Sequence, residues 1–193
     1  MPDTAAHVLP AGTFSGTAQP VLPTGDGLLL RPWRSADVPA VYAAFQDPLM
    51  HQWHIRAADS EEEVAGWIAE WQRCWDTERN AQWAVVDEDS GLLLGRMALR
   101  CVLLSEGTAE VAYWTTGAAR GRGVASRATT ALTGWAFDEI GFHRLELIHA
   151  TANEASCRVA AKAGFTLEGT KRSAALHQDG WHDMHLHARV QGD

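Results

Sequence analysis

A basic, glycine-rich turn in the middle of the chain restricts the fold more than any other segment. The apolar segment 109–115, AEVAYWT, is expected to be a strand, and the segment 126–140 is expected to be a helix. Between them stands the turn Arg120-Gly121-Arg122-Gly123-Val124-Ala125. Glycines allow the backbone to approach a ligand closely, and the free amides at a helix start bind anions, to which arginines add charge and bidentate contacts. We therefore expect this strand–turn–helix unit to hold a pyrophosphate.

Two other interpretations of the turn remain open. The spacing Gly121-x-Gly123-x-x-Ser126 half-resembles a dinucleotide-binding fingerprint. Its third glycine is missing, however, and the preceding strands are predicted to be antiparallel rather than part of a βαβ unit. A glycine turn that only begins a helix is the second alternative.

The order of predicted elements indicates a mixed α/β (α+β) domain with one central sheet. Residues 1–24 contain four prolines and no periodicity, so we expect a flexible arm there and one folded domain over 25–193. Helices are expected over 35–45, 60–76, 126–140 and 154–163. Strands are expected over 27–32, 82–87, 91–104, 109–115, 144–150, 165–169, 173–178 and 181–189.

Composition excludes several classes of protein. The net charge of −8 argues against a nucleic-acid binder. No apolar run approaches the ~20 residues of a membrane helix, and the N-terminus lacks the basic and apolar regions of a secretory signal. Three cysteines without a C-x-x-C pair are typical of reduced thiols. We therefore expect a cytoplasmic protein with neither nucleic acid nor membrane as partner.

Further motifs follow the turn in a fixed order. Arg120, Gly123 and Ala125 match the pattern R/Q-x-x-G-x-G/A. The other matching motifs are Tyr113-Trp114, Phe-His-Arg-Leu at 142–145, Asn153-x-x-Ser156, Gly-Phe-x-x-Glu-Gly at 164–169 and Asp-Gly-Trp-x-Asp at 179–183. Over residues 27–190 the chain thus resembles the GNAT acyltransferases, and within them the RimJ/RimL branch that acetylates protein N-terminal amines.

The resemblance implies a single domain whose central, mostly antiparallel mixed sheet has two splayed strands and flanking helices. It also implies transfer of an acyl group, normally acetyl from acetyl-CoA without a metal, to a primary amine. The acceptor would be a protein N-terminus or a small-molecule amine, and a homodimer is a further expectation. Succinyl-CoA as donor and a non-catalytic acyl-CoA-binding module remain alternatives.

The same resemblance assigns cofactor-binding residues. Backbone groups of Tyr113, Trp114 and Thr115 would receive the pantetheine arm between the splayed strands. The pyrophosphate would lie on the backbone amides of Gly121, Arg122, Gly123, Val124 and Ala125, beside Arg120. Asn153 would bond the pantetheine amides, although asparagine also caps helices. Ser156 would donate to the leaving thiolate, or it is merely tolerated in the first helical turn.

The general base has two candidates. Glu110 lies on a strand expected to splay, where the wider family often has a glutamate that acts through water, but a structural ion pair would equally explain it. The branch can carry a second glutamate where this sequence has Ala175, so the inherited base is in doubt. His149, whose ordinary pKa is about 6.5, is the alternative.

Aromatic and histidine residues cluster in two further segments. Trp67, Trp71 and Trp75 form an i, i+4, i+8 stripe that is either core or, with Trp53, the lining of an acceptor pocket or dimer contact. His177, His182, His185 and His187 with Asp183 suggest metal ligands, but one strand cannot close a tetrahedral site and no thiol pair accompanies them. We therefore expect no metal, and expect His182 to lie at the acceptor site or an interface.

Overall fold

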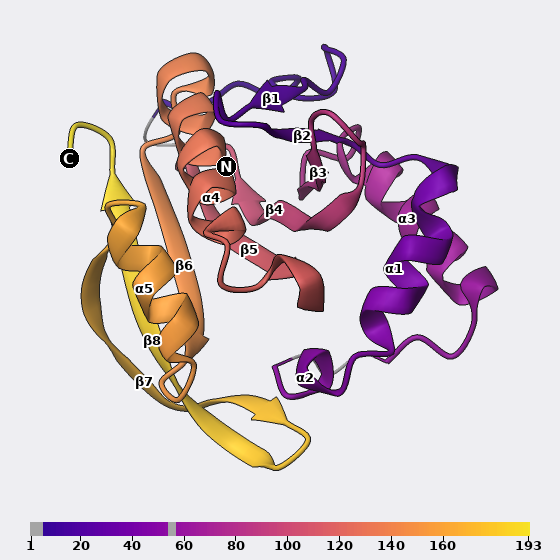
Figure 1. Ribbon diagram of the computed structural model, residues 1–193. Helices are drawn as coiled ribbons and strands as arrows, with labels where there is room; N and C mark the ends of the chain where they lie inside the picture. Colours follow the sequence, from indigo (N-terminus) through magenta and orange to yellow (C-terminus); the bar gives the residue numbers. More distant parts are fainter. Residues whose placement is uncertain (1–5, 54–56) are drawn as a thin grey trace.

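One mixed sheet forms the centre of the computed structural model, which describes residues 6–53 and 57–193 (Figure 1). Its eight strands lie in the order β1-β2-β3-β4-β5-β6-β8-β7. Neighbouring strands are antiparallel except for β5 and β6, which are parallel. The strands are β1 (Leu22–Pro23), β2 (Leu28–Pro32), β3 (Ala81–Asp87), β4 (Leu93–Leu103), β5 (Thr108–Thr115), β6 (Arg144–Ala150), β7 (Thr166–His177) and β8 (Gly180–Val190). The expected mixed, mostly antiparallel sheet is confirmed.

Helices cover both faces of this sheet. They are η1 (Ser35–Asp37), α1 (Val38–Phe45), α2 (Pro48–His51), α3 (Glu61–Cys74), η2 (Gly117–Ala119), α4 (Val124–Gly134), the π-helical turn η3 (Trp135–Ile140) and α5 (Glu154–Lys162). Side chains of β3 alternate between two cores: Trp83 and Val85 lie in the cluster with α4 and α5, whereas Ala84 and Val86 lie in the cluster with α1 and α3. β3 is apolar almost throughout because both of its faces are covered. In the described ranges no helix is both long and apolar enough to cross a bilayer.

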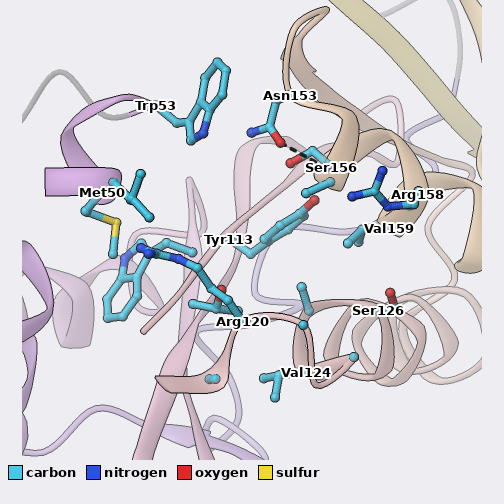
Figure 2. A pocket seen from close by; sticks show the side chains of 18 of the residues that line it. Met50, Trp53, Tyr113, Arg120, Val124, Ser126, Asn153, Ser156, Arg158 and Val159 are labelled. Atoms are coloured by element: carbon cyan, nitrogen blue, oxygen red, sulfur yellow. Dashed lines mark hydrogen bonds between the residues drawn. The ribbon is translucent and has the colours of Figure 1, made fainter. Parts of the chain in front are cut away.

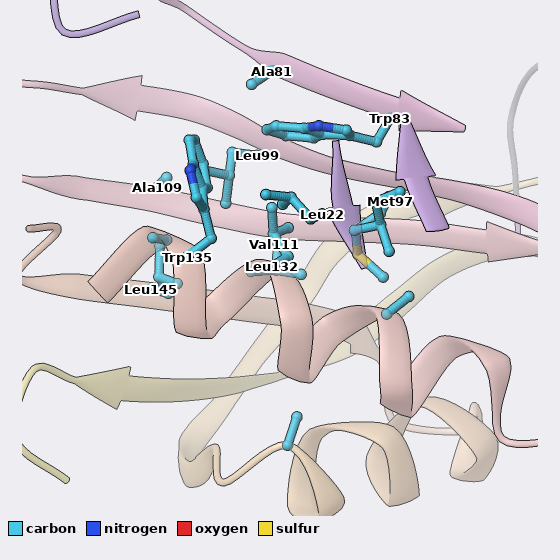
Figure 3. Packing of buried hydrophobic residues seen from close by; sticks show 14 of the residues in the cluster. Leu22, Ala81, Trp83, Met97, Leu99, Ala109, Val111, Leu132, Trp135 and Leu145 are labelled. Carbon is cyan, nitrogen blue, oxygen red and sulfur yellow. The ribbon is translucent and has the colours of Figure 1, made fainter. Parts of the chain in front are cut away.

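The core between the sheet and α4 is rich in aromatic rings (Figure 3). Trp83 of β3 and Trp135 at the end of α4 lie 5.4 Å apart, ring centre to ring centre, in an edge-to-face arrangement. Trp75, at the end of α3, belongs to this core, whereas Trp67 and Trp71 pack in the other one. The tryptophan stripe of the second predicted helix is therefore core, divided between the two faces of the sheet.

The central strands separate at the middle of the sheet. Parallel pairing joins β5 residues 108–111 to β6 residues 144–147 and then stops. Beyond that point β5 stays paired with β4, and β6 with β8. A Cβ at Gly95 of β4 would collide with the carbonyl oxygen of Trp114, so this glycine allows β4 to follow β5 closely. The predicted splay between β5 and β6 is thus present.

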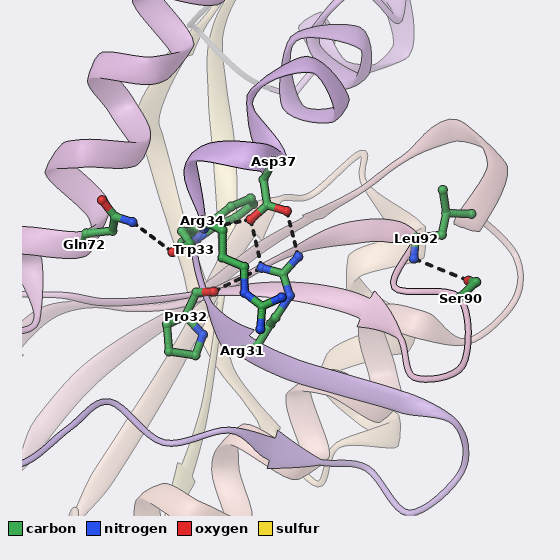
Figure 4. A network of polar contacts seen from close by, with 8 residues as sticks. All are labelled: Arg31, Pro32, Trp33, Arg34, Asp37, Gln72, Ser90 and Leu92. Carbon is green, nitrogen blue, oxygen red and sulfur yellow. Dashed lines mark hydrogen bonds and ion pairs between the residues drawn. The ribbon is translucent and has the colours of Figure 1, made fainter.

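A buried ion pair joins β2 to the first helix (Figure 4). The guanidinium of Arg31 donates to both carboxylate oxygens of Asp37 at 2.8 and 2.7 Å. Asp37 also accepts the backbone N–H of Arg34 at 2.8 Å, and Gln72 of α3 donates to the Trp33 carbonyl at 2.9 Å. These contacts fix η1 and α3 to the end of β2.

The N-terminal segment corrects the expectation of a flexible arm over 1–24. Phe14 is fully buried, and its ring stacks on Trp75 at 4.8 Å. The Glu78 carboxylate accepts backbone N–H groups from Gly12, Phe14 and Ser15 at 2.8, 2.6 and 3.2 Å. Residues 1–5 lie outside the described range. Isolated apolar anchors without helical or strand spacing hold the segment, which is why no periodicity indicated it.

The C-terminal region also differs from the expectation. The segments expected as two strands over 165–178 form the single strand β7, whose pairing with β8 is interrupted between Lys171 and Ala175. Ser173 has a positive φ of 47°, and its N–H donates to Asp183 at 2.8 Å.

The helix expected to start at Ser126 begins two residues earlier, at Val124, and ends at Gly141, where φ is 89°.

Candidate active site

A pocket of about 460 Å³ opens beside the N-terminus of α4 (Figure 2). Its walls come from α2 and the residues after it, the end of β5, the turn before α4, and α5. The predicted cofactor residues that line it are Tyr113, Trp114, Thr115, Arg120, Gly121, Gly123, Val124, Ala125, Asn153 and Ser156. Folding therefore brings together residues that lie more than forty positions apart in the sequence.

The turn before α4 presents unused backbone donors. Gly121 and Gly123 both have φ of +73°, a conformation that favours glycine, and Gly123 is the N-cap of α4. Within the described chain no acceptor is found for the amides of Gly121, Gly123, Val124, Ala125 and Ser126. Such amides, at the positive end of a helix, form an anion site. These amides could hold a pyrophosphate, and that assignment stays a prediction.

The two arginines of the turn do not lie as expected. Arg120 forms an ion pair with Asp47, the N-cap of α2, at 2.7 Å, so a phosphate would have to compete for it. The exposed Arg122 does not line the pocket, and its backbone N–H donates to the Ala119 carbonyl at 3.4 Å, which corrects its assignment to the pyrophosphate site. Two cations that the sequence analysis missed, Arg158 and Lys162 of α5, line the pocket instead. Their i, i+4 spacing, which places them on one helix face, was the available signal.

Asn153 begins α5. Its side-chain oxygen accepts the backbone N–H of Ser156 at 3.1 Å, so the capping interpretation is correct. Ser156 lies beside the ring of Tyr113 in Figure 2. Burial raises the pKa of Tyr113 to about 12, and the neighbouring Ser156 lowers it only in part. The phenol of Tyr113 is therefore protonated at neutral pH.

A second pocket of about 580 Å³ occupies the opening between the splayed strands. Residues of β5, the end of β6 and the tip of the β7–β8 hairpin line it, among them Glu110, His149 and Ala175. Trp53, Tyr113, Asn153 and Ser156 line both pockets. The two pockets thus meet at these four residues, where the predicted thiolate donor stands.

The two base candidates have different surroundings. A carboxylate oxygen of Glu110 lies 3.9 Å from the half-exposed Arg100, a long ion pair that leaves the acid in the second pocket. His149 is buried, with Nδ1 2.9 Å from the Ala150 carbonyl and Nε2 3.1 Å from Nε2 of His187. Burial lowers the pKa of His149, the Ala150 carbonyl opposes this, and the charge of His185 lowers it further. Both ring nitrogens of His149 thus face other groups of the protein, Nδ1 the Ala150 carbonyl and Nε2 the ring of His187.

The expectation of no metal rested on the histidines of a single strand. The structure corrects this, because it adds potential ligands from two other elements. In the structure, His185 and His187 of β8 meet His149 of β6 and Cys157 of α5, and the four potential ligand atoms lie within 4.8 Å of one another. A second group, His177, Asp179 and His182, stands at the tip of the β7–β8 hairpin.

Comparisons with known proteins agree on one family. The family model described as acetyltransferase (GNAT) domain matches residues 27–166. The chain is 25% identical over 173 residues to an uncharacterized N-acetyltransferase, YoaA, of Bacillus subtilis, covering 89% of this chain and 97% of YoaA. It is 32% identical over 83 residues to the ribosomal-protein-serine acetyltransferase of Escherichia coli, covering 43% of this chain and 46% of that protein. The solved structure of RimL, a ribosomal L7/L12 alpha-N-protein acetyltransferase, in complex with coenzyme A superimposes with a TM-score of 0.82 at 20% identity, covering 89% of this chain and 98% of RimL.

Proposed function

Because this chain belongs to the GNAT family and is an acyl-CoA-dependent N-acetyltransferase, we propose that it acetylates the N-terminal amine of a protein. The observation that carries this proposal is the meeting of two pockets at Trp53, Tyr113, Asn153 and Ser156. One pocket offers amides to a pyrophosphate, whereas the other opens between strand ends and has room for a chain terminus. The likeness to a ribosomal-protein acetyltransferase supports the same class of acceptor.

In this proposal acetyl-CoA lies in the first pocket. Its pyrophosphate accepts from the free amides of residues 121 and 123–126, near Arg158 and Lys162. The pantetheine arm pairs with the backbone of Tyr113–Thr115, whose edge towards β6 has no strand partner. Backbone pairing holds the carrier without reading the acyl group. The thioester then reaches the residues shared by the two pockets.

The chemistry requires a neutral amine. We assign Glu110 as the base that removes the ammonium proton, directly or through a water molecule, because its carboxylate lies in the second pocket, whereas the ring nitrogens of His149 face Ala150 and His187. The amine nitrogen attacks the thioester carbonyl, a backbone N–H near Tyr113–Trp114 stabilises the oxyanion, and the C–S bond breaks. Ser156 donates a proton to the departing thiolate and regains one from the attacking nitrogen, which loses its extra proton, directly or through water, as the amide forms.

A peptide panel tests the acceptor. Thiol release from acetyl-CoA is measured with peptides that have a free N-terminus, with the same peptides blocked at the N-terminus but containing lysine, and with polyamines. We expect turnover with free N-termini and acetylation at the α-amine by mass spectrometry. Turnover with polyamines alone would replace the proposed acceptor with a small molecule. No turnover with any amine would favour the non-catalytic acyl-CoA-binding module.

Ser156 has a matched control in the same pocket. Ser156→Ala should lower kcat roughly 10- to 1,000-fold, as for loss of a general acid, with unchanged affinity for acetyl-CoA. Ser126→Ala, which keeps the backbone amide of another pocket-lining serine, should leave kcat near the wild-type value. Equal activity of both variants would remove Ser156 from the mechanism.

We also propose a cytoplasmic location and a homodimer. Cys74, Cys101 and Cys157 are all free thiols, as expected in a reducing compartment. At the tip of the β7–β8 hairpin, Leu176 and Trp181 are exposed by 53% and 65%, and such apolar side chains are enriched at interfaces. Sedimentation equilibrium tests the dimer, and a single species of 21.0 kDa would contradict it.

A further inference from the structure

We propose that His149, His185, His187 and Cys157 form a binding site for one zinc ion, which joins α5 to strands β6 and β8. Three separate elements supply the ligands. His149 and His185 stand directly opposite each other in the antiparallel β6–β8 pair, and His187 lies two residues along β8, on the same face. Cys157 comes from the first half of α5, which packs over these strands. This site is separate from the acetyl-transfer chemistry proposed above.

The distances among the four side chains suit a small tetrahedral cation. His149 Nε2 and His187 Nε2 lie 3.1 Å apart, Cys157 Sγ lies 4.0 Å from His187 Nε2, and all four potential ligand atoms lie within 4.8 Å of one another. Tetrahedral zinc with Zn–N of about 2.0–2.1 Å and Zn–S of about 2.3 Å separates its ligand atoms by roughly 3.3–3.6 Å. Side-chain movements of about 1 Å would therefore close the site.

The hydrogen bond between His149 and Ala150 orients one lone pair towards the cluster. Because His149 Nδ1 lies 2.9 Å from the Ala150 carbonyl, it carries the ring proton and donates it, so Nε2 presents a lone pair to the cluster. A ring N–H held by a backbone carbonyl is the usual arrangement of a metal-binding histidine. Nδ1 of His185 is buried and has no hydrogen-bond partner among the described residues. A cation held through Nδ1 of His185 would satisfy this orphaned atom, whose burial is otherwise unfavourable.

The donor atoms select the class of metal. Imidazole nitrogen and thiolate sulfur suit zinc, whereas magnesium and calcium prefer oxygen ligands. Four protein ligands leave no open coordination position, which is typical of a structural rather than a catalytic zinc site. The ion would fix the first turn of α5, and with it Asn153 and Ser156, to the sheet.

Cobalt(II) provides a direct test because a cobalt–thiolate bond gives a charge-transfer band that histidine and carboxylate ligands do not give. The full-length protein, without an affinity tag and treated with EDTA, is titrated with Co²⁺ and then with Zn²⁺ or Mg²⁺. We expect one equivalent of Co²⁺ to give the thiolate band, Zn²⁺ to remove it stoichiometrically and raise Tm, and Mg²⁺ to leave it unchanged. Absence of a saturable thiolate band would overturn the proposal.

Variants locate the ion. Cys157→Ser should abolish the thiolate band, and His185→Gln should weaken Co²⁺ binding at least about 10-fold, as for loss of a ligand contact. The control His177→Gln alters the hairpin-tip group, which contains no thiol, and should leave the band unchanged. Circular dichroism checks that each variant is folded. If one of the two ligand variants does not fold, the other still tests the proposal. Unchanged Co²⁺ affinity in His185→Gln, or loss of the band in His177→Gln, would place the ion elsewhere.

Discussion

Phe14→Ala should destabilise the whole domain, although the residue lies in a segment without helix or strand. The Phe14 ring is fully buried and stacks on Trp75 with ring centres 4.8 Å apart. It also contacts Trp135 and Phe142, each at 6.1 Å. These partners belong to α3, to the end of α4 and to the loop before β6, so the ring joins elements from the whole length of the chain.

The expected loss follows from this burial. Truncation of a buried phenylalanine to alanine costs about 3–5 kcal/mol, including the cavity that remains. The free energy of unfolding of a typical domain is about 5–15 kcal/mol, so the change removes a large fraction of it. For a domain of this size, 1 kcal/mol corresponds to about 2–4 °C in Tm, and we expect a decrease of roughly 10 °C.

Urea unfolding followed by tryptophan fluorescence measures this effect, since two of the partner rings are indoles. The control Val21→Ala changes a side chain in the same segment that is 52% exposed, and its effect should stay within about 0.5 kcal/mol. A loss below about 1 kcal/mol for Phe14→Ala would refute the reasoning. It would mean that the segment detaches from the core at little cost, as a flexible arm would.

Three further changes test the site and the N-terminal segment. Gly123→Val places a β-branched residue at a positive φ, which costs about 1–3 kcal/mol of backbone strain. Calorimetry should show that acetyl-CoA binding is abolished, while the circular dichroism spectrum stays unchanged. An unaltered Kd would contradict the role of the turn. Glu110→Gln should lower kcat/KM, whereas Arg100→Gln should leave it near the wild-type value; a wild-type kcat/KM in Glu110→Gln would exclude this base. Burial raises the pKa of Glu78, but three hydrogen bonds from backbone N–H groups outweigh this effect and hold the pKa below the ordinary 4.5. The Glu78 carboxylate therefore stabilises the folded protein above pH 4.5, and this contribution is lost as the pH falls through the lower pKa of the folded state. The difference in stability between wild type and Glu78→Gln should therefore shrink in acid, and a constant difference would contradict this linkage.

Local signals in the sequence predicted most elements of the fold. The strand 144–150 has the predicted bounds because its buried residues alternate. At the start of α3, in the helix expected over 60–76, Ser60 accepts the N–H of Glu63 at 3.1 Å, as a serine that caps a helix does. The family motifs indicated the splay, whose strands contact different neighbours beyond residue 111.

Features that depend on tertiary contacts could not be predicted in this way. Phe14 is an isolated aromatic residue whose partners begin about sixty positions later, so no local period indicates it. Cys157 and His187 are thirty residues apart and meet only when α5 packs on the sheet. The Arg120–Asp47 ion pair likewise depends on how the turn before α4 lies against α2. The roles of Glu110 and Ser156 in the reaction stay predictions.

The irregularity in β7 has a consequence for how the molecule behaves at high concentration. β7 is a 12-residue strand at the open edge of the sheet, and a regular strand there would offer its unpaired N–H and C=O groups to a second molecule. The interrupted pairing between Lys171 and Ala175 bends this edge, and the exposed Lys171 and Arg172 add two positive charges to it. The opposite edge, β1, is only two residues long. Both ends of the sheet thus resist edge-to-edge aggregation, one by distortion and charge and the other by shortness.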